Sequence, residues 1–127
     1  MERNVDVAII GAGTAGLSAM SQVRQAKKDF VLINGGELGT TCARVGCMPS
    51  KALIQVAHDL HRCEIFEREG IEGGADLTVN LPDALEHVRD LRDILVDRVL
   101  ANSTDQMGET FIDGYVRFVD PGVLQVG

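Results

Sequence analysis

The first third of the chain alternates short apolar runs with polar, glycine-containing turns. The run over 5–10 is mostly apolar and rich in β-branched residues, which predicts a buried strand of a parallel sheet. A glycine turn follows at 11–16, and the pattern over 14–27 predicts an amphipathic helix. The apolar run at 30–33 predicts a second strand, so the order is that of a βαβ unit. The helix side expected to pack on the sheet carries Ala15, Leu17, Ala19, Val23 and Ala26.

The middle of the chain is predicted to be a loop followed by helix. The loop covers 37–50, and a helix is expected to begin near Cys42 or shortly after it, with Pro49 in its first turn, where its missing N–H costs little. The helical pattern continues over 51–68, and a cluster of glycines then favours a loop over 69–80.

The last third of the chain predicts a long helix and a hairpin. Apolar residues at three- and four-residue spacing indicate an amphipathic helix over 82–102. The run 111–119 predicts one strand, and a turn at 120–122 brings the chain back in a second strand over 123–126. The whole pattern predicts an α/β fold with a parallel sheet, three layers and a β-hairpin excursion.

Composition narrows the function classes. The 127 residues suit one domain, and 12 basic against 19 acidic residues give a net charge of −7, which argues against a nucleic-acid partner. No apolar run approaches the length of a membrane-spanning helix, so no membrane partner is expected. The N-terminal run is a poor signal peptide, which predicts a reducing, cytoplasmic location in which three cysteines are not a disulfide scaffold.

Three glycines mark the most specific motif of the N-terminal region. Gly11, Gly13 and Gly16 form G-x-G-x-x-G directly after a predicted strand and at the start of a predicted helix. The first glycine permits the tight turn, the second lets backbone approach a pyrophosphate, and the third lets the helix pack on the strand. We therefore expect a dinucleotide site here, and the alternative is a merely tight glycine turn.

The end of the second strand carries Asn34 where such sites usually have an acid for a ribose hydroxyl. An amide can still form a hydrogen bond with a hydroxyl, but without the assistance of charge. Glu37 lies nearby and would need the loop to fold back. The contact to ribose is therefore expected to be weaker than usual.

Two cysteines separated by four residues are the second candidate site. Cys42 and Cys47 could be unrelated buried thiols, or part of a zinc site with His58, His61 and Cys63, and no metal site is favoured because the spacing is poor. The redox interpretation is stronger, since a bent loop could bring the two sulfurs together and a thiol at a helix N-terminus has a lowered pKa. Lys51 follows one helical turn later, where its charge can reach the same face.

The segment 39–51, with its Cys-x4-Cys-x-Pro-Ser-Lys pattern, resembles the redox-active segment of the flavoprotein disulfide reductases. Within them it is most similar to the dihydrolipoyl dehydrogenases. The distance from the glycine loop to the cysteines fits, as does the later Gly114 with its hairpin. The resemblance covers nearly the whole chain but only the N-terminal part of the family's proteins, and it implies a Rossmann-like FAD-binding domain over 1–127 that is incomplete at its C-terminus.

The resemblance also implies roles for individual residues. Cys42 matches the cysteine that exchanges with a dithiol substrate, Cys47 the charge-transfer thiolate against the flavin, and Lys51 a lysine near the flavin N5. The remaining matches concern FAD binding, where Asn34 replaces a usual Glu and Thr40 a common Gly. The residues assigned to the cofactor by this resemblance are Gly11, Gly13, Thr14, Ala15 and Gly16 at the pyrophosphate, Asn34 at the ribose, Gly39, Thr40 and Thr41 at the phosphate and flavin, and Gly114 at the adenine side.

The family reaction needs parts that this sequence does not contain. These are a second glycine fingerprint for NAD, and an interface domain whose His–Glu pair serves the partner subunit of a homodimer. We therefore expect the parent to oxidise a dithiol such as dihydrolipoamide with FAD and NAD, and the 127-residue chain to be inactive and to bind FAD weakly or not at all. The alternatives are a free-standing nucleotide-binding module without turnover and a parent of the mercuric or glutathione reductase kind.

Overall fold

The computed structural model describes residues 2–127, and they form two compact units. Unit 1 consists of the residues up to Thr41 together with Val96–Gly127, and unit 2 consists of Cys42–Leu95. The candidate nucleotide loop lies in unit 1 and both candidate redox cysteines lie in unit 2. Each unit is described by itself below.

A three-stranded parallel sheet forms the centre of unit 1. Its strands are β1 (Val7–Ile10), β2 (Phe30–Asn34) and β3 (Phe111–Asp113), in the spatial order β1-β2-β3. The register sets Ile9 beside Leu32, and Leu32 beside Phe111, so apolar side chains of all three strands share one face. Parallel order places the carboxyl ends of the three strands at the same edge of the sheet, where the loops that carry the candidate site begin.

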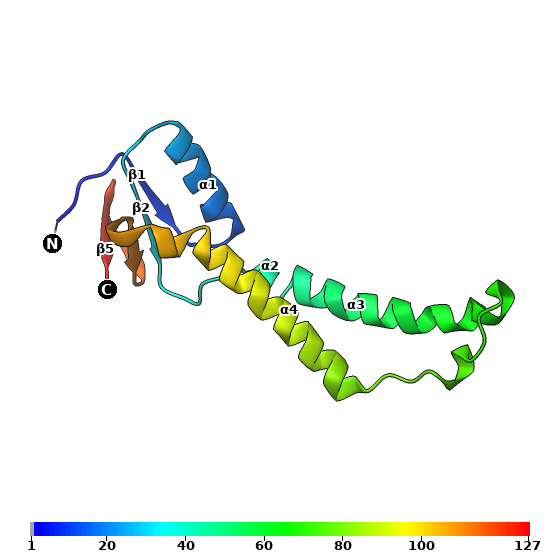
Figure 1. Ribbon diagram of the computed structural model, residues 1–127. Coiled ribbons are helices and arrows are strands. Elements are labelled where there is room, and N and C mark those ends of the chain that lie inside the picture. The colour runs from blue at the N-terminus through cyan, green and yellow to red at the C-terminus, as the bar shows by residue number, and fades with distance from the viewer. Residues whose placement is uncertain (1) are drawn as a thin grey trace. The chain divides into compact units, whose positions relative to one another are not determined.

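Helix α1 (Thr14–Gln25) covers that face of the sheet, and the polypeptide connects β1, α1 and β2 as the predicted βαβ unit (Figure 1). Met20 of α1 is buried with Ile9, Leu32 and Met107, whereas Ala15, Ala19 and Ala26, which were expected to pack, are exposed. Leu17 and Val23, the other two residues expected to pack, do lie against this cluster, so the predicted side is right in part.

The two strands predicted in the N-terminal third of the chain differ in burial. Every residue of β2 from Phe30 to Ile33 is buried, as a central parallel strand requires. In β1 the alternate residues Ala8 and Ile10 are exposed, and half of the Ile10 surface is accessible. The prediction of a fully buried first strand is therefore wrong for one of its faces.

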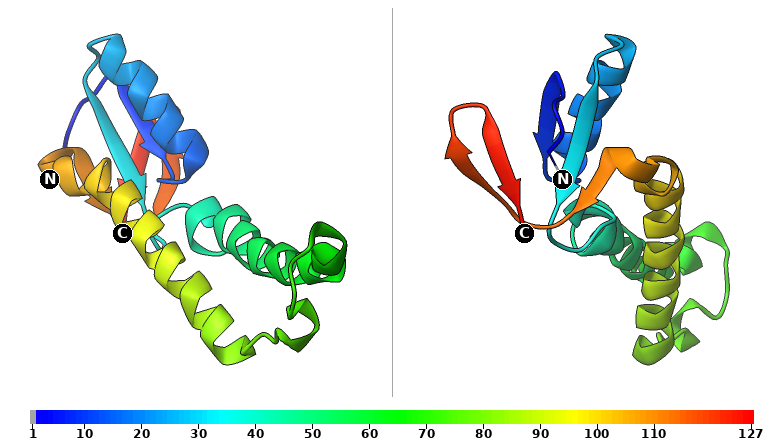
Figure 2. Two further views of the ribbon diagram at one scale, coloured as in Figure 1. Left: turned by 45° about the vertical axis from the view of Figure 1, so that its right-hand side comes forward. Right: turned by 90° about the vertical axis from the view of Figure 1, so that its left-hand side faces the viewer.

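The single strand predicted over 111–119 is in fact two strands that belong to different sheets. β3 ends at Asp113, and β4 (Val116–Asp120) pairs instead with β5 (Val123–Val126) in an antiparallel hairpin (Figure 2). Gly114 separates them with a φ of 153°, a conformation that residues with a side chain rarely adopt. The turn and the returning strand of the hairpin are as predicted.

Unit 2 is almost entirely helical. Helix α2 (Thr41–Arg44) is followed by α3 (Cys47–His61), so helix begins near Cys42 and Pro49 lies in the first turn of α3, as predicted. Helix α3 gives way to the 3-10 helix η1 (Arg62–Glu69). A short 3-10 turn, η2 (Gly74–Asp76), interrupts the predicted loop. The chain then enters α4 (Leu81–Ala101), within one residue of the predicted bounds. From Val96 onward α4 belongs to unit 1, where two more 3-10 turns, η3 (Thr104–Gln106) and η4 (Gly108–Thr110), connect it to β3.

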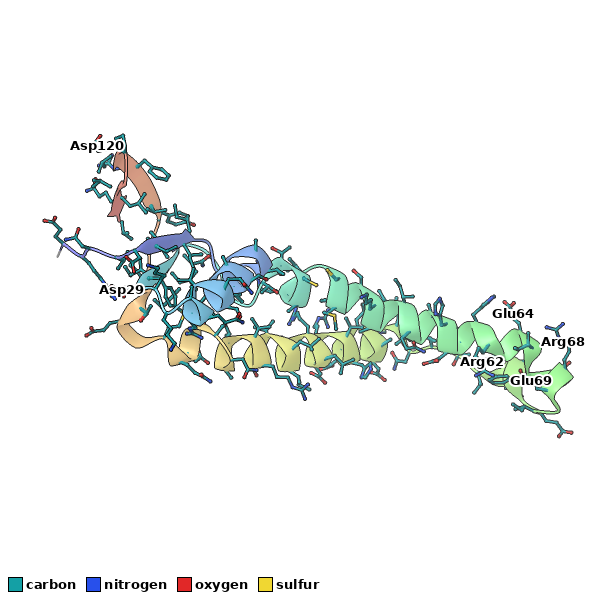
Figure 3. All side chains as sticks on the ribbon, turned by 90° about the horizontal axis from the view of Figure 1, so that it is seen from above. Asp29, Arg62, Glu64, Arg68, Glu69 and Asp120 are labelled. Carbon is teal, nitrogen blue, oxygen red and sulfur yellow. The ribbon has the colours of Figure 1, made fainter. Side chains whose placement is uncertain are left out.

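Few side chains of unit 2 are buried. Helix α3 has no buried residue, and more than half of the Ile54 surface on it is accessible. Arg62 and Glu69, the first and last residues of η1, pair at 3.4 Å, and Figure 3 shows their side chains near each other. Within residues 2–127, no helix is both long enough and apolar enough to cross a membrane.

Candidate functional site

The glycine loop between β1 and α1 has the backbone that its sequence predicts. Gly11 has a φ of 97° and donates its N–H to the carbonyl oxygen of Ile33 at 2.7 Å, which fixes the turn against β2. A Cβ on Gly16 would lie 1.8 Å from the carbonyl oxygen of Gly11, so only glycine allows this approach of α1 to the turn. The structure confirms the predicted turn and packing roles of these two glycines.

Gly13 has a different environment, since a Cβ built on it would meet no atom within 4 Å. It precedes α1, whose first residues Thr14 and Ala15 are exposed. The first N–H groups of a helix have no intrahelical partner and carry partial positive charge, so they favour an anion such as a pyrophosphate. The open space at Gly13 and the free end of α1 therefore fit the phosphates of a dinucleotide.

Asn34 ends β2 beside this loop, and its side chain is held by the protein itself. Its Oδ1 accepts the N–H of Ala12 at 3.0 Å, and its Nδ2 donates to the carbonyl oxygen of Gly36 at 2.6 Å. The residue assigned to the ribose thus also supports the glycine loop. Sequence reasoning missed Ala12 as its partner, because nothing in the sequence shows which backbone N–H faces the end of the next strand.

Gly114 lies at the end of β3 and closes the same edge of the sheet. Its N–H donates to the carbonyl oxygen of Asn34 at 3.1 Å. A Cβ on Gly35 would come within 2.8 Å of the Gly114 backbone, and a Cβ on Gly114 would lie 2.6 Å from Val126. Two glycines are therefore needed for these chain segments to meet. The importance of Gly35 was missed, although its place directly after a strand was a usable signal.

The segment that leads to the cysteines has an unusual backbone. Gly39 and Thr40 both have positive φ, 106° and 64°, and a Cβ on Gly39 would lie 2.7 Å from Val96 of α4. Left-handed backbone is costly for a β-branched residue, so Thr40 has a conformation that glycine would adopt more easily. Thr41 follows as the exposed first residue of α2.

Within unit 2, Cys42 and Cys47 lie close enough to share a hydrogen bond between their side chains. Both are free thiols; Cys42 is half-buried and Cys47 is exposed. Cys47 is the first residue of α3, and the turn before it is fixed by Ser50, whose hydroxyl donates to the carbonyl oxygen of Gly46 at 2.8 Å. The two free thiols are therefore neighbours, and their pairing as a redox disulfide stays a prediction.

The environment of Cys42 makes its proton harder to remove. The hydrogen bond with the Cys47 side chain is the largest cause that raises the pKa of Cys42, and burial and the charge of Cys47 act in the same direction. The backbone N–H of Cys47 and the positive charge of Lys51 lower this pKa, but by less. Lys51, although exposed, is thus electrostatically connected to the dithiol.

The third cysteine and the neighbouring histidines do not join this pair. Cys63 is a half-buried free thiol in η1, and His61 pairs with Glu64 at 3.2 Å. Across residues 2–127, no group of three or more His, Cys, Asp or Glu side chains is placed to hold a metal ion. The candidate residues therefore fall into two sets, a nucleotide set in unit 1 and a dithiol set in unit 2. Each set is described within its own unit.

The sequence of the chain is similar to those of known oxidoreductases. Residues 5–117 match the family model described as pyridine nucleotide-disulphide oxidoreductase. A dihydrolipoyl dehydrogenase from Vibrio cholerae serotype O1 is 30% identical over 98% of the chain, and a mercuric reductase from Streptomyces lividans is 31% identical over 95% of it. Each alignment covers 26% of the relative, so the chain spans about a quarter of the length of these proteins.

A solved structure shares the fold. The HOCl-induced flavoprotein disulfide reductase RclA from Escherichia coli, in its Cu(II) complex, superimposes on 99% of the chain with a TM-score of 0.68. The match includes 25% of that protein, and the two sequences are 22% identical. The likeness supports the Rossmann-like α/β architecture.

Proposed function

Because the chain belongs to the pyridine nucleotide-disulphide oxidoreductase family, we propose that it carries the FAD-binding loop and the redox dithiol of a dihydrolipoyl dehydrogenase-like enzyme. The observation that supports this most directly is the hydrogen-bonded pair of Cys42 and Cys47 at the start of α3, within the electrostatic influence of Lys51. Neither a structural thiol pair nor a plain nucleotide-binding module needs that combination.

The residues of unit 1 fit the cofactor. Gly13 leaves open space in front of the first N–H groups of α1, and the turn at Gly11 is already formed. We propose that Gly11, Gly13, Thr14, Ala15 and Gly16 hold the pyrophosphate of FAD, with Asn34 and Gly114 at the adenosine side and Gly39, Thr40 and Thr41 toward the flavin. Bound FAD would supply the acceptor for the two electrons of the dithiol, with NAD as the final acceptor in the parent.

The chemistry of the dithiol follows from thiol–disulfide exchange. In the oxidised protein a thiolate of dihydrolipoamide attacks the sulfur of Cys42, the Cys42–Cys47 bond breaks, and Cys47 leaves as a thiolate. The second thiolate of the substrate then attacks its own mixed disulfide and releases Cys42. The substrate loses two electrons and becomes a cyclic disulfide, and the cysteine pair gains them. The raised pKa of Cys42 favours return of a proton to that sulfur, and Lys51 stabilises negative charge on the pair.

A chemical test uses the 127-residue chain with Cys63 replaced by Ala. The oxidised Cys42–Cys47 form is mixed with dihydrolipoamide, and the free protein thiols and the lipoamide formed are measured. We expect two protein thiols per lipoamide. Cys42→Ser and Cys47→Ser variants are matched controls that can form no internal disulfide. Failure of the Cys63→Ala protein to form or exchange that disulfide would contradict the proposal.

The isolated chain is proposed to lack turnover. Its matched relatives are about four times longer, and we propose that the NAD site and the acid–base pair that a partner subunit supplies belong to the remaining parts of such proteins. We expect no NADH-dependent lipoamide reduction by the purified chain, which is also proposed to be cytoplasmic and to retain little FAD. Stoichiometric flavin that stays bound through gel filtration would contradict the last point.

A mercuric reductase-like parent is a second candidate, because the relative from Streptomyces lividans is as similar as the dihydrolipoyl dehydrogenase from Vibrio cholerae. Pro49, Ser50 and Lys51 favour lipoamide over glutathione as the substrate. A full-length protein whose NADPH-dependent rate with Hg²⁺ exceeds its rate with lipoamide would support this second candidate and exclude the first.

A further inference from the structure

Asn34 uses its amide to connect two backbone turns. Oδ1 accepts the Ala12 N–H and Nδ2 donates to the Gly36 carbonyl oxygen. One partner is a donor and the other an acceptor, so only one orientation of the amide satisfies both. The side chain is therefore fixed in direction by the protein.

The backbone of Asn34 adds a third connection, since its carbonyl oxygen accepts the N–H of Gly114. Ala12 follows β1, Gly36 follows β2 and Gly114 follows β3. A single residue thus holds the chain segments that leave the carboxyl ends of three neighbouring strands. These are the segments from which a parallel α/β sheet builds a nucleotide site.

The amide is matched to its place in a way that a carboxylate is not. An aspartate in the same position could still accept a hydrogen bond from the Ala12 N–H. Its second carboxylate oxygen would take the place of Nδ2, which now lies 2.6 Å from the carbonyl oxygen of Gly36. Two acceptors without a proton between them repel each other. Local structure therefore favours an amide where such sites usually carry an acid.

An amide at position 34 offers a nucleotide different hydrogen-bonding groups from those of a carboxylate. After its two bonds the amide retains one lone pair on Oδ1 and one N–H on Nδ2. The lone pair can accept from a ribose hydroxyl, and the N–H can donate to a phosphate oxygen. A carboxylate would accept a hydrogen bond from the ribose hydroxyl and repel a phosphate group. Asn34 is uncharged, so it does not discriminate by charge between a free ribose and a phosphorylated one.

We propose that Asn34 is a positioning residue that holds the glycine loop in place, and that the adenosine end of this site accepts a 2′-phosphorylated ribose as readily as a free one. The second part rests on the proposed nucleotide-binding function of the loop. The ligand class is thus an adenine dinucleotide or its half, with or without a phosphate on the ribose.

The test is a titration of the ¹⁵N-labelled 127-residue chain with ADP-ribose and with ADP-ribose 2′-phosphate, which differ only in the ribose phosphate. The amide signals of the glycine loop are monitored by NMR, a method that also measures weak binding. We expect dissociation constants within about threefold of each other, and a preference of about tenfold for ADP-ribose in Asn34→Asp.

Asn102→Asp is the matched control. Asn102 also donates its Nδ2 to a backbone carbonyl oxygen, that of Arg98 at 2.8 Å, and it lies in unit 1 directly after α4. Both variants add one negative charge and lose one such bond. We expect Asn34→Asp to lower the thermal midpoint of the ligand-free chain further than Asn102→Asp and to broaden the Ala12 amide signal.

The outcomes separate this inference from the function on which it rests. If neither ligand shifts the loop signals, the nucleotide-binding proposal fails and this inference fails with it. If the unmodified chain prefers ADP-ribose by about tenfold, binding stands and the tolerance of phosphate is wrong. If the two aspartate variants behave alike in stability, in Ala12 signal and in ligand preference, Asn34 is not a positioning residue.

Discussion

Unit 1 and unit 2 obtain their candidate sites in opposite ways. In unit 1 the site depends on residues far apart in the sequence: Ala12, Asn34 and Gly114 meet because three parallel strands end at one edge. In unit 2 the two sulfurs are five residues apart and meet through a turn between two helices. The nucleotide site therefore depends on tertiary packing, whereas the dithiol depends on local chain geometry.

Burial follows the same division. Unit 1 contains an apolar cluster of buried side chains. Leu32 lies in this cluster, and its side chain is wholly inaccessible to solvent. Within Cys42–Leu95, only Ala43, Gly74 and Val88 are buried. Substitutions in unit 1 should thus act mainly through folding, and those around the cysteines mainly through ionisation and reactivity.

The largest effect is expected at Gly16. A Cβ there would meet the backbone oxygen of Gly11, which has no flexible end to move aside, so Gly16→Ala should prevent the native packing of α1 on the sheet. The matched control is Gly13→Ala, which adds the same methyl group in open space and should change the free energy of unfolding by about 0.5 kcal/mol. Urea unfolding followed by circular dichroism measures both. Equal stability of the two variants would contradict the tight packing of α1.

The next effect tests the difference in burial. Leu32→Ala should lower the free energy of unfolding by about 3 kcal/mol, because it removes a fully buried side chain from the centre of β2. Ile54→Ala on the exposed side of α3 should cost about 0.5 kcal/mol. Similar costs in urea unfolding would show that the two units do not differ as described.

Ionisation of the dithiol provides a third test. In the reduced chain with Cys63→Ala, Cys47→Ala should lower the pKa of Cys42, since the hydrogen bond and the charge that raise it are both removed. The pH dependence of the alkylation rate of Cys42 by iodoacetamide measures this. Cys47→Ser keeps a hydroxyl partner and should produce a smaller decrease. An unchanged or higher midpoint in Cys47→Ala would mean that Cys47 does not control Cys42.

A smaller shift in the opposite direction is expected at Lys51. Its positive charge favours the Cys42 thiolate, so Lys51→Met should raise the pKa of Cys42 further, and less so at high salt. Lys28→Met in unit 1 removes the same charge and should leave the alkylation profile of Cys42 where it was. Equal profiles for the two variants would exclude a role for Lys51 at the dithiol.

The smallest effect is on stability as a function of pH. The pKa of Cys42 is higher in the folded chain than in the unfolded chain, so the folded state retains the proton that the unfolded state releases first. This contribution is fully present below the unfolded pKa and is lost as the pH rises through the folded one. Urea midpoints of the reduced protein should fall slightly more over this alkaline range than those of Cys42→Ala.

The sequence by itself determined the features that depend on neighbouring residues. The glycine turn at Gly11, the start of α1 and the bounds of α4 follow from spacing and from the conformations that glycine allows. The proximity of Cys42 and Cys47 follows from their spacing across a short bend.

Tertiary structure alone decided how the strands are shared and what Asn34 contacts. The runs on either side of Asp113 and Gly114 are alike in β-propensity, and they belong to different sheets because β2 offers an edge to Phe111–Asp113 while β5 pairs with Val116–Asp120. The amide of Asn34 finds Ala12 only once β1 and β2 lie side by side. A local pattern cannot specify a partner 22 residues away, because strand pairing depends on the packing of the whole unit.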